Sequence, residues 1–111
     1  MSKNLYTKDE IILCTYLAIY GYNEFSEIDI HKKYNRSLNS IRMKVKNIAA
    51  MLDEEGITRY SNIRGLSGVS AGENGRRTNW NWVEESIPFS KRELFSKCES
   101  FLHTHELENI S

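Results

Sequence analysis

The stretch that decides the fold runs from Ser37 to Gly56 and has the sequence SLNSIRMKVKNIAAMLDEEG. Its apolar residues recur every three or four positions, which is the period of an α-helix with one buried face. Serine is a good residue before the first turn of a helix, and glycine is a good residue after the last. The pattern therefore predicts a long amphipathic helix that ends at Gly56. Its apolar stripe consists of Leu38, Ile41, Val45, Ile48, Ala49 and Leu52.

A first helix is predicted upstream, close to the N-terminus. Thr7 and Glu10 have the spacing of a capping box and stand directly before an apolar run. Apolar residues at three- and four-residue steps then predict an amphipathic helix from about Lys8 to Tyr20. Gly21 is placed to end this helix.

A second, shorter helix is predicted between these two. It begins after Ser26 and uses Ile28, Ile30 and Tyr34 as its apolar residues. Residues 35–37 then form a tight connection into the long helix. Three helices with this spacing are typical of a mainly α fold, a trihelical bundle of the helix-turn-helix kind.

The helical period is lost beyond Gly56. Residues 57–79 contain four more glycines together with several Ser and Asn residues, which predicts an irregular glycine-rich arm. An irregular segment of this length is uncommon in a small domain and is usually functional. Ser90 and Glu93 again have capping-box spacing, so we expect a C-terminal helix after an apolar anchor.

These elements define one domain. We expect it to cover residues 1–103 and to consist of the helical core 7–56, the glycine-rich arm 57–79, and the C-terminal anchor and helix 80–103. Residues 104–111 are predicted to form a flexible tail.

The composition is that of an ordinary globular chain. The 111 residues are 40% hydrophobic, enough for a packed core, and they contain no apolar run near the ~20 residues that span a bilayer. Cys14 and Cys98 are too few and too far apart for a disulfide framework or a zinc site. No secretory leader opens the chain, so we expect a cytoplasmic protein. The cysteine spacing and the lack of a nucleotide-binding motif lead us to expect no metal and no cofactor.

The charge is unevenly distributed, although the net charge is zero. Residues 31–47 carry six basic side chains and no acid, and residues 57–82 carry four arginines and one acid. A solvated helix face usually mixes both signs. The pattern therefore favours a positively charged surface whose partner is double-stranded DNA.

The outward face of the long helix is predicted to contact the DNA bases. If the apolar stripe faces inward, Asn39, Arg42, Met43 and Lys46 face outward. Asn and Arg have bidentate geometry for adenine and guanine, and we hypothesise that Met43 contacts a thymine or 5-methylcytosine methyl group. The other predicted DNA contacts flank this face: Lys32, Lys33, Arg36, Ser37, Ser40, Lys44, Arg59, Tyr60, Arg64, Arg76 and Arg77.

Three sequence blocks carry a resemblance to a known family. RSLNSIRMKVKNIAAMLDEEG at 36–56, RGLSGVS at 64–70 and a tryptophan with an acidic pair (WVEE) at 82–85 resemble a segment near the N-terminus of many bacterial HNH-type endonucleases. The resemblance covers roughly residues 34–85. It implies a DNA-recognition module ahead of a nuclease, in restriction systems that act on modified DNA. The matching positions are Arg36, Ser37, Ser40, Met43, Lys44, Asn47, Ile48, Ala49, Leu52, Asp53, Gly65, Leu66, Ser67, Ser70 and one of Trp80 or Trp82.

The catalytic half of such an endonuclease has no counterpart in this sequence. The three histidines, His31, His103 and His105, form no acid–histidine constellation at a sensible spacing. We therefore expect a DNA-binding domain that is not an enzyme, either excised from a nuclease or acting as a small stand-alone relative. The alternative is a protein-interaction module, such as a phage-encoded inhibitor of a host defence enzyme.

Overall fold

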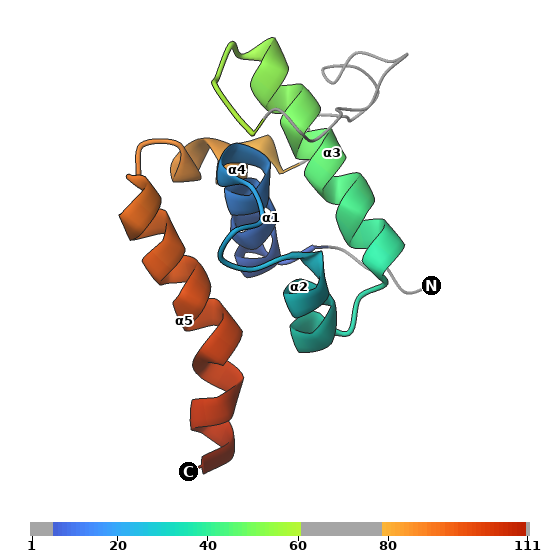
Figure 1. The fold of residues 1–111 in the computed structure, drawn as a ribbon, viewed down its shortest axis with the longest axis vertical. Helices are drawn as coiled ribbons and strands as arrows, with labels where there is room; N and C mark the ends of the chain where they lie inside the picture. Colours follow the sequence, from blue (N-terminus) through green and yellow to red (C-terminus); the bar gives the residue numbers. More distant parts are fainter. Residues whose placement is uncertain (1–5, 61–78, 111) are drawn as a thin grey trace.

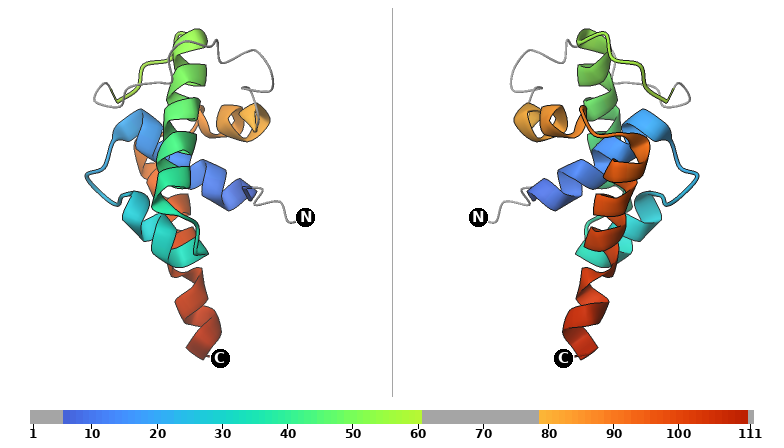
Figure 2. Two further views of the ribbon diagram at one scale, coloured as in Figure 1. Left: turned by 90° about the vertical axis from the view of Figure 1, so that its right-hand side faces the viewer. Right: turned by 90° about the vertical axis from the view of Figure 1, so that its left-hand side faces the viewer.

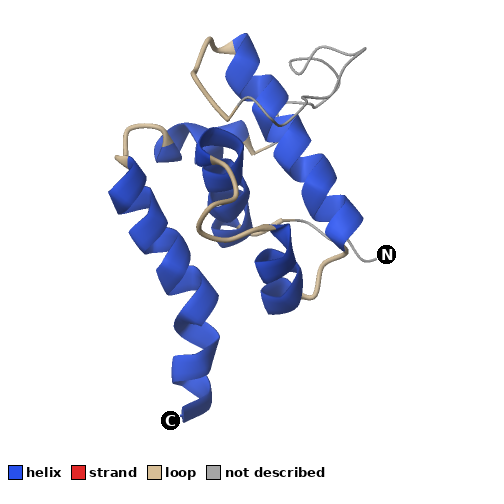
Figure 3. Cartoon of the chain, viewed as in Figure 1, coloured by secondary structure: helices blue, strands red, loops and turns tan. Residues whose placement is uncertain are grey.

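The computed structural model describes residues 6–60 and 79–110, and within these ranges the fold is mainly helical and contains no strand (Figures 1 and 3). This confirms the predicted fold class. The structure has one helix more than the sequence predicted. In chain order the helices are α1 (Lys8–Tyr20), α2 (Glu27–Tyr34), α3 (Leu38–Glu54), α4 (Trp80–Ser86) and α5 (Lys91–Ile110).

The predicted helix starts are confirmed by their capping hydrogen bonds. At α1 the Thr7 side chain accepts from the backbone N–H of Glu10, and the Glu10 carboxylate accepts from the backbone N–H of Thr7 at 2.8 Å. Ser37 caps α3 by accepting from the backbone N–H of Ser40 at 3.1 Å. Such caps satisfy backbone donors that the first turn of a helix leaves unpaired.

Helix α1 lies at the centre of the fold and contacts each of the other four helices (Figures 1 and 2). Every residue from Glu10 to Ala18 is buried, so the prediction of an amphipathic α1 was wrong. Thr15, a buried polar residue of this helix, donates its hydroxyl to the Ile11 carbonyl oxygen at 2.7 Å. A helix surrounded by neighbours has no solvent face to leave polar.

Most of the apolar stripe of α3 is buried as predicted: Ile41, Ile48, Ala49 and Leu52 are fully inaccessible and Val45 is 1% exposed, whereas Leu38, in the first turn, is only half-buried. In α2 only Ile30 is buried, whereas Ile28 is 48% exposed, which contradicts its predicted core position. Residues two apart on a helix point about 200° away from each other. One narrow contact face therefore cannot bury both isoleucines.

Two further corrections concern the C-terminal part. The predicted apolar anchor includes α4, which spans seven residues and is too short to show a helical period in the sequence. Helix α5 continues to Ile110, so the expected flexible tail from residue 104 is helical. Residues 91–110 contain no glycine or proline and many good helix formers. The C-terminal part of α5 extends beyond the other helices (Figures 1 and 2).

The start of the arm returns to the helical core. The backbone N–H of Ile57 donates to the Leu52 carbonyl oxygen, and that of Tyr60 donates to the Ala18 carbonyl oxygen. The rest of the predicted arm, residues 61–78, lies outside the described residues. No helix in the described part of the chain is long and apolar enough to cross a membrane.

Candidate nucleic-acid interface

The face of α3 opposite the core carries four exposed side chains, Asn39, Arg42, Met43 and Lys46, which we call the outer stripe. Met43 is 50% exposed, an unusual degree for a large apolar residue, and the Arg42 side chain is 54% exposed. The four residues are spaced at three- and four-residue steps and therefore form one continuous strip. This is the orientation that the sequence predicted for them.

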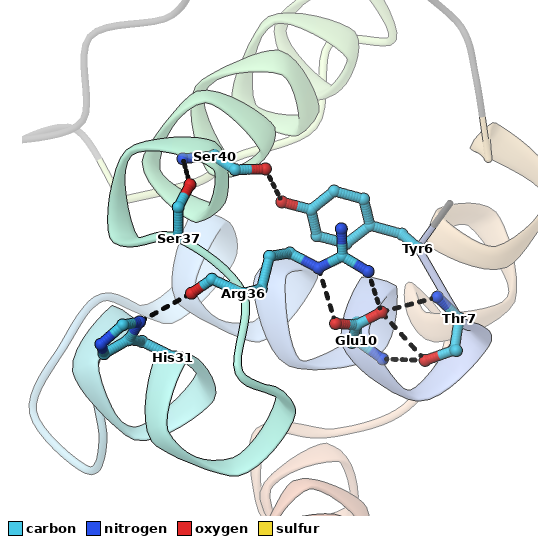
Figure 4. Close-up of polar contacts among 7 residues, drawn as sticks. All are labelled: Tyr6, Thr7, Glu10, His31, Arg36, Ser37 and Ser40. Atoms are coloured by element: carbon cyan, nitrogen blue, oxygen red, sulfur yellow. Dashed lines mark hydrogen bonds and ion pairs between the residues drawn. The ribbon is translucent and has the colours of Figure 1, made fainter. Parts of the chain in front are cut away.

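The connection between α2 and α3 is short and held by hydrogen bonds. Asn35 adopts the left-handed conformation (φ 55°, ψ 38°), and its backbone N–H donates to the His31 carbonyl oxygen at 2.9 Å. The His31 Nδ1 atom lies 2.7 Å from the Arg36 carbonyl oxygen (Figure 4). These contacts and the Ser37 cap define where α3 begins relative to α2.

Arg36, which was predicted to contact phosphate, forms a salt bridge within the fold. Its Nε and Nη2 atoms donate to the two oxygens of Glu10 at 2.8 and 3.0 Å (Figure 4). The Glu10 side chain is 1% exposed and that of Arg36 is 13% exposed. The Arg36 guanidinium also lies 3.8 Å from the centre of the Tyr6 ring. The hydrogen bond to Glu10 raises the pKa of Arg36.

Ser40 and Lys44 belong to the same internal network. The Ser40 hydroxyl lies 2.7 Å from the Tyr6 hydroxyl, and the Lys44 Nζ atom donates to the Asn79 side-chain oxygen at 3.3 Å. Lys44 is half-buried, and this burial lowers its pKa. Both side chains therefore join α3 to its neighbours instead of lying on the outer stripe. Tyr6 and Asn79, the partners, were not identified from the sequence.

Arg59 is likewise engaged within the fold. Its Nε and Nη2 atoms donate to the two oxygens of Asp53 at 2.8 and 2.9 Å, and its Nη1 atom donates to the Tyr60 carbonyl oxygen at 2.7 Å. The hydrogen bond from Arg59 lowers the pKa of Asp53. The half-buried Tyr60 ring packs against Gly21 and lies 5.9 Å from the Tyr22 ring. Arg59 and Tyr60, both predicted DNA contacts, are thus held by contacts within the fold.

Lys32 and Lys33 lie on α2 and reach solvent. Neither forms a hydrogen bond or ion pair with any residue that the structure describes. Both line a hollow between α2 and α5. The basic block 31–47 is thus divided among the outer stripe, the internal network and this hollow. The remaining predicted contacts, Arg64, Arg76 and Arg77, lie outside the described residues.

One acid lies beside the outer stripe. Glu27, on α2, accepts a hydrogen bond from the Tyr22 hydroxyl at 2.6 Å and lies 3.8 Å from the Arg42 Nε atom. The longer of these distances leaves Arg42 only loosely paired. Arg42 and Lys46 are thus the cations of the outer stripe, with Glu27 at its edge.

Groups suited to metal or thiol chemistry were also sought. In residues 6–60 and 79–103, where side chains are described, no cluster of three or more His, Cys, Asp or Glu residues could hold a metal ion. Cys14 and Cys98 are free, fully buried thiols. Burial raises the pKa of both thiols, that of Cys98 to about 12, so neither is an activated nucleophile.

Comparisons of the chain with known protein families, with curated proteins and with solved structures found no match.

Proposed function

We propose that this chain is a DNA-binding module of the helix-turn-helix type, in which α3 enters the major groove. The observation that carries the proposal is the outer stripe: a helix buried along one face presents Asn39, Arg42, Met43 and Lys46 along the other. The major groove is about 12 Å wide and accepts one α-helix with its side chains.

The arrangement of the first three helices supports this proposal. Helices α2 and α3 are joined by residues 35–37 only, and α1 packs against both. A helix-turn-helix unit has the same parts, with the second helix of the pair in the groove and the first crossing the backbone. Helix α1 would supply the rigid support that precise base contacts need.

The side chains of the outer stripe suit base recognition. Asn39 and Arg42 have the bidentate geometry for adenine and guanine, and Met43 offers an apolar surface to a methyl group of thymine or 5-methylcytosine. Lys46 would neutralise phosphates together with Lys32 and Lys33. The resemblance to HNH-type endonucleases adds a setting: recognition of specific or modified duplex DNA within a restriction system, beside a fused or associated nuclease. The module itself performs no catalytic step.

The proposal is tested by fluorescence anisotropy with labelled duplexes, methylated and unmodified, over a range of salt concentrations. With three phosphate-reaching cations (Lys32, Lys33 and Lys46), affinity should fall about 40-fold between 50 and 200 mM salt. Arg42→Ala should relax sequence preference by about 1–3 kcal/mol, whereas Lys46→Ala should weaken all sequences alike. Lys97→Ala on α5 is the control with the same change in charge. Equal losses for all three variants, or no dependence on salt, would refute the proposal.

One observation favours the alternative of a protein-interaction module, such as an inhibitor of a host defence enzyme. Tyr22, Ile28 and Met43 are large apolar residues that are 38, 48 and 50% exposed. Exposed apolar residues that cluster mark protein interfaces more often than DNA interfaces. Absence of duplex binding at 50 mM salt would select this alternative. Ile28→Asp should then abolish binding of the protein partner without changing the thermal unfolding temperature.

A further inference from the structure

A hollow of about 360 Å³ lies between α2 and α5, apart from the outer stripe of α3. Its volume falls within the range of about 300–1,000 Å³ that is usual for small-molecule sites. The hollow is open to solvent and is lined by apolar and charged side chains from both helices and by Glu24 and Phe25, which precede α2. These two kinds of lining determine which ligand it would accept.

The apolar lining is formed by Phe25, Phe95 and Leu102. The two phenylalanines are held in place from behind by Tyr16, whose ring centre lies 5.3 Å from that of Phe25 and 5.8 Å from that of Phe95. Tyr16 itself is fully buried, and its hydroxyl donates to Glu24 at 3.0 Å. Contact with the buried Tyr16 ring restrains both phenylalanines, which favours binding of an apolar group against them.

Among the charged lining groups with no hydrogen-bond or ion-pair partner in the described residues, two are lysines and one is an acid, Glu99, so this part of the lining carries a net positive charge. Lys32 and Lys33 have no hydrogen-bond or ion-pair partner among the described residues. Two of the lining acids are already engaged: Glu24 lies 3.6 Å from the Lys91 Nζ atom, and Asp29 accepts from the Ser26 backbone N–H at 2.9 Å. A third acid, Glu99, lines the hollow from α5.

From this combination we propose that the α2–α5 hollow binds a small amphipathic anion, an aromatic or acyl group that bears a carboxylate, sulfonate or phosphate. The apolar body would lie against Phe25, Phe95 and Leu102, and the anionic group would face Lys32 and Lys33. Burial of an apolar body provides affinity, and the two lysines select the sign of the charge. The site does not depend on the DNA-binding proposal.

A second hollow, near the N-terminus of α1, is the natural comparison. It has a volume of about 250 Å³ and is lined by Lys8, Lys97, Phe89 and Phe101, among others. Both of its lysines are engaged, because the Lys8 Nζ atom lies 2.8 Å from Glu85 and the Lys97 Nζ atom lies 4.9 Å from the centre of the Phe89 ring. It is therefore the weaker candidate for an anion and a suitable control.

The test uses the purified full chain and the fluorescent anion 8-anilinonaphthalene-1-sulfonate. Titration should give saturable binding to one site, and the neutral analogue N-phenyl-1-naphthylamine, which lacks the sulfonate, should bind at least about tenfold more weakly. The double variant Lys32→Ala/Lys33→Ala should lose about tenfold in affinity for the anion. Glu99→Gln should gain about two- to threefold, because it removes a repelling carboxylate.

The matched control is Lys8→Ala/Lys97→Ala, which removes the same charge from the second hollow and should leave the affinity unchanged. Circular dichroism and thermal unfolding verify that each variant is folded. All substituted side chains in the test are partly or fully exposed, so folding should be preserved. Equal binding of the neutral analogue, equal losses in both double variants, or no saturable binding would overturn the proposal.

Discussion

Replacing Arg36 by Met would leave the Glu10 carboxylate buried without its cation. Glu10 is 1% exposed and receives two hydrogen bonds from Arg36, at 2.8 and 3.0 Å. Removing one partner of a buried pair costs about 3–5 kcal/mol, mostly because the remaining charge has lost its compensation. Since the Arg36 side chain retains 13% exposure, we expect the lower end, about 3 kcal/mol.

A loss of this size is large beside the total stability of a small domain, which is about 5–15 kcal/mol. It corresponds to a decrease of about 10–20 °C in the midpoint of thermal unfolding. Urea titration followed by far-UV circular dichroism measures the free energy of unfolding directly. The control is Arg42→Met, an arginine that is 54% exposed and 3.8 Å from its nearest acid, which should cost less than about 0.5 kcal/mol.

A double variant separates the charge from the packing. Adding Glu10→Gln to Arg36→Met removes the unpaired buried charge, so the double variant should be more stable than Arg36→Met alone. Packing of the Arg36 side chain on the Tyr6 ring, at 3.8 Å, predicts that recovery is incomplete. If Arg36→Met cost no more than Arg42→Met, the ion pair would not be a structural element, and Arg36 would return as a candidate phosphate contact.

Three further predictions concern pH and backbone conformation. Arg59 lowers the pKa of Asp53, so their ion pair stabilises the fold fully above about pH 4. This contribution is below about 1 kcal/mol because Asp53 is half-exposed, and it is lost as the pH falls through the lowered pKa of Asp53. Acid titration of the free energy of unfolding should show the loss in the parent chain and not in Arg59→Met. Burial raises the pKa of Tyr34 to about 12, so stability should decrease once the pH exceeds the ordinary value near 10, and urea unfolding at increasing pH should show a smaller decrease for Tyr34→Phe. Gly21 has φ 90°, and an added Cβ would meet the Tyr60 ring at 2.9 Å, so Gly21→Ala should destabilise the fold by more than about 1 kcal/mol. The cost should exceed that of Gly56→Ala, where the space around an added Cβ is open. Urea unfolding compares the two variants, and equal costs would contradict the contact with Tyr60.

Local signals in the sequence predicted the starts of four of the five helices that the structure describes: α1, α2, α3 and α5. Helices α1 and α3 begin where Thr7 and Ser37 cap them, and both were predicted from spacing alone. Their success has a physical cause, because an N-cap side chain bonds to a backbone N–H only three positions further along the chain. Helix α5 also begins at its predicted cap, Ser90 and Glu93, but it ends later than expected since no residue within it breaks the helix.

The outer stripe was predictable in the same way. Periodicity identified the buried residues of α3, and the opposite residues followed from helix geometry, as the exposure of Arg42 and Met43 shows. Packing that surrounds a helix was the part that a search for one apolar face missed. Helix α1 is buried from Glu10 to Ala18 because four other helices contact it, and the signal in its own sequence is that residues 11–18 are apolar on every face apart from Thr15.

The sequence by itself determined where helices start and which face of α3 is apolar, since these depend on residues within one or two turns of each other. Only the tertiary structure decided which charges remain available to a partner. Arg36 pairs with Glu10 across 26 positions, and Lys44 bonds to Asn79 across 35. A charge count along the chain treats all cations alike, whereas folding brings some of them against acids and amides that the sequence places far away.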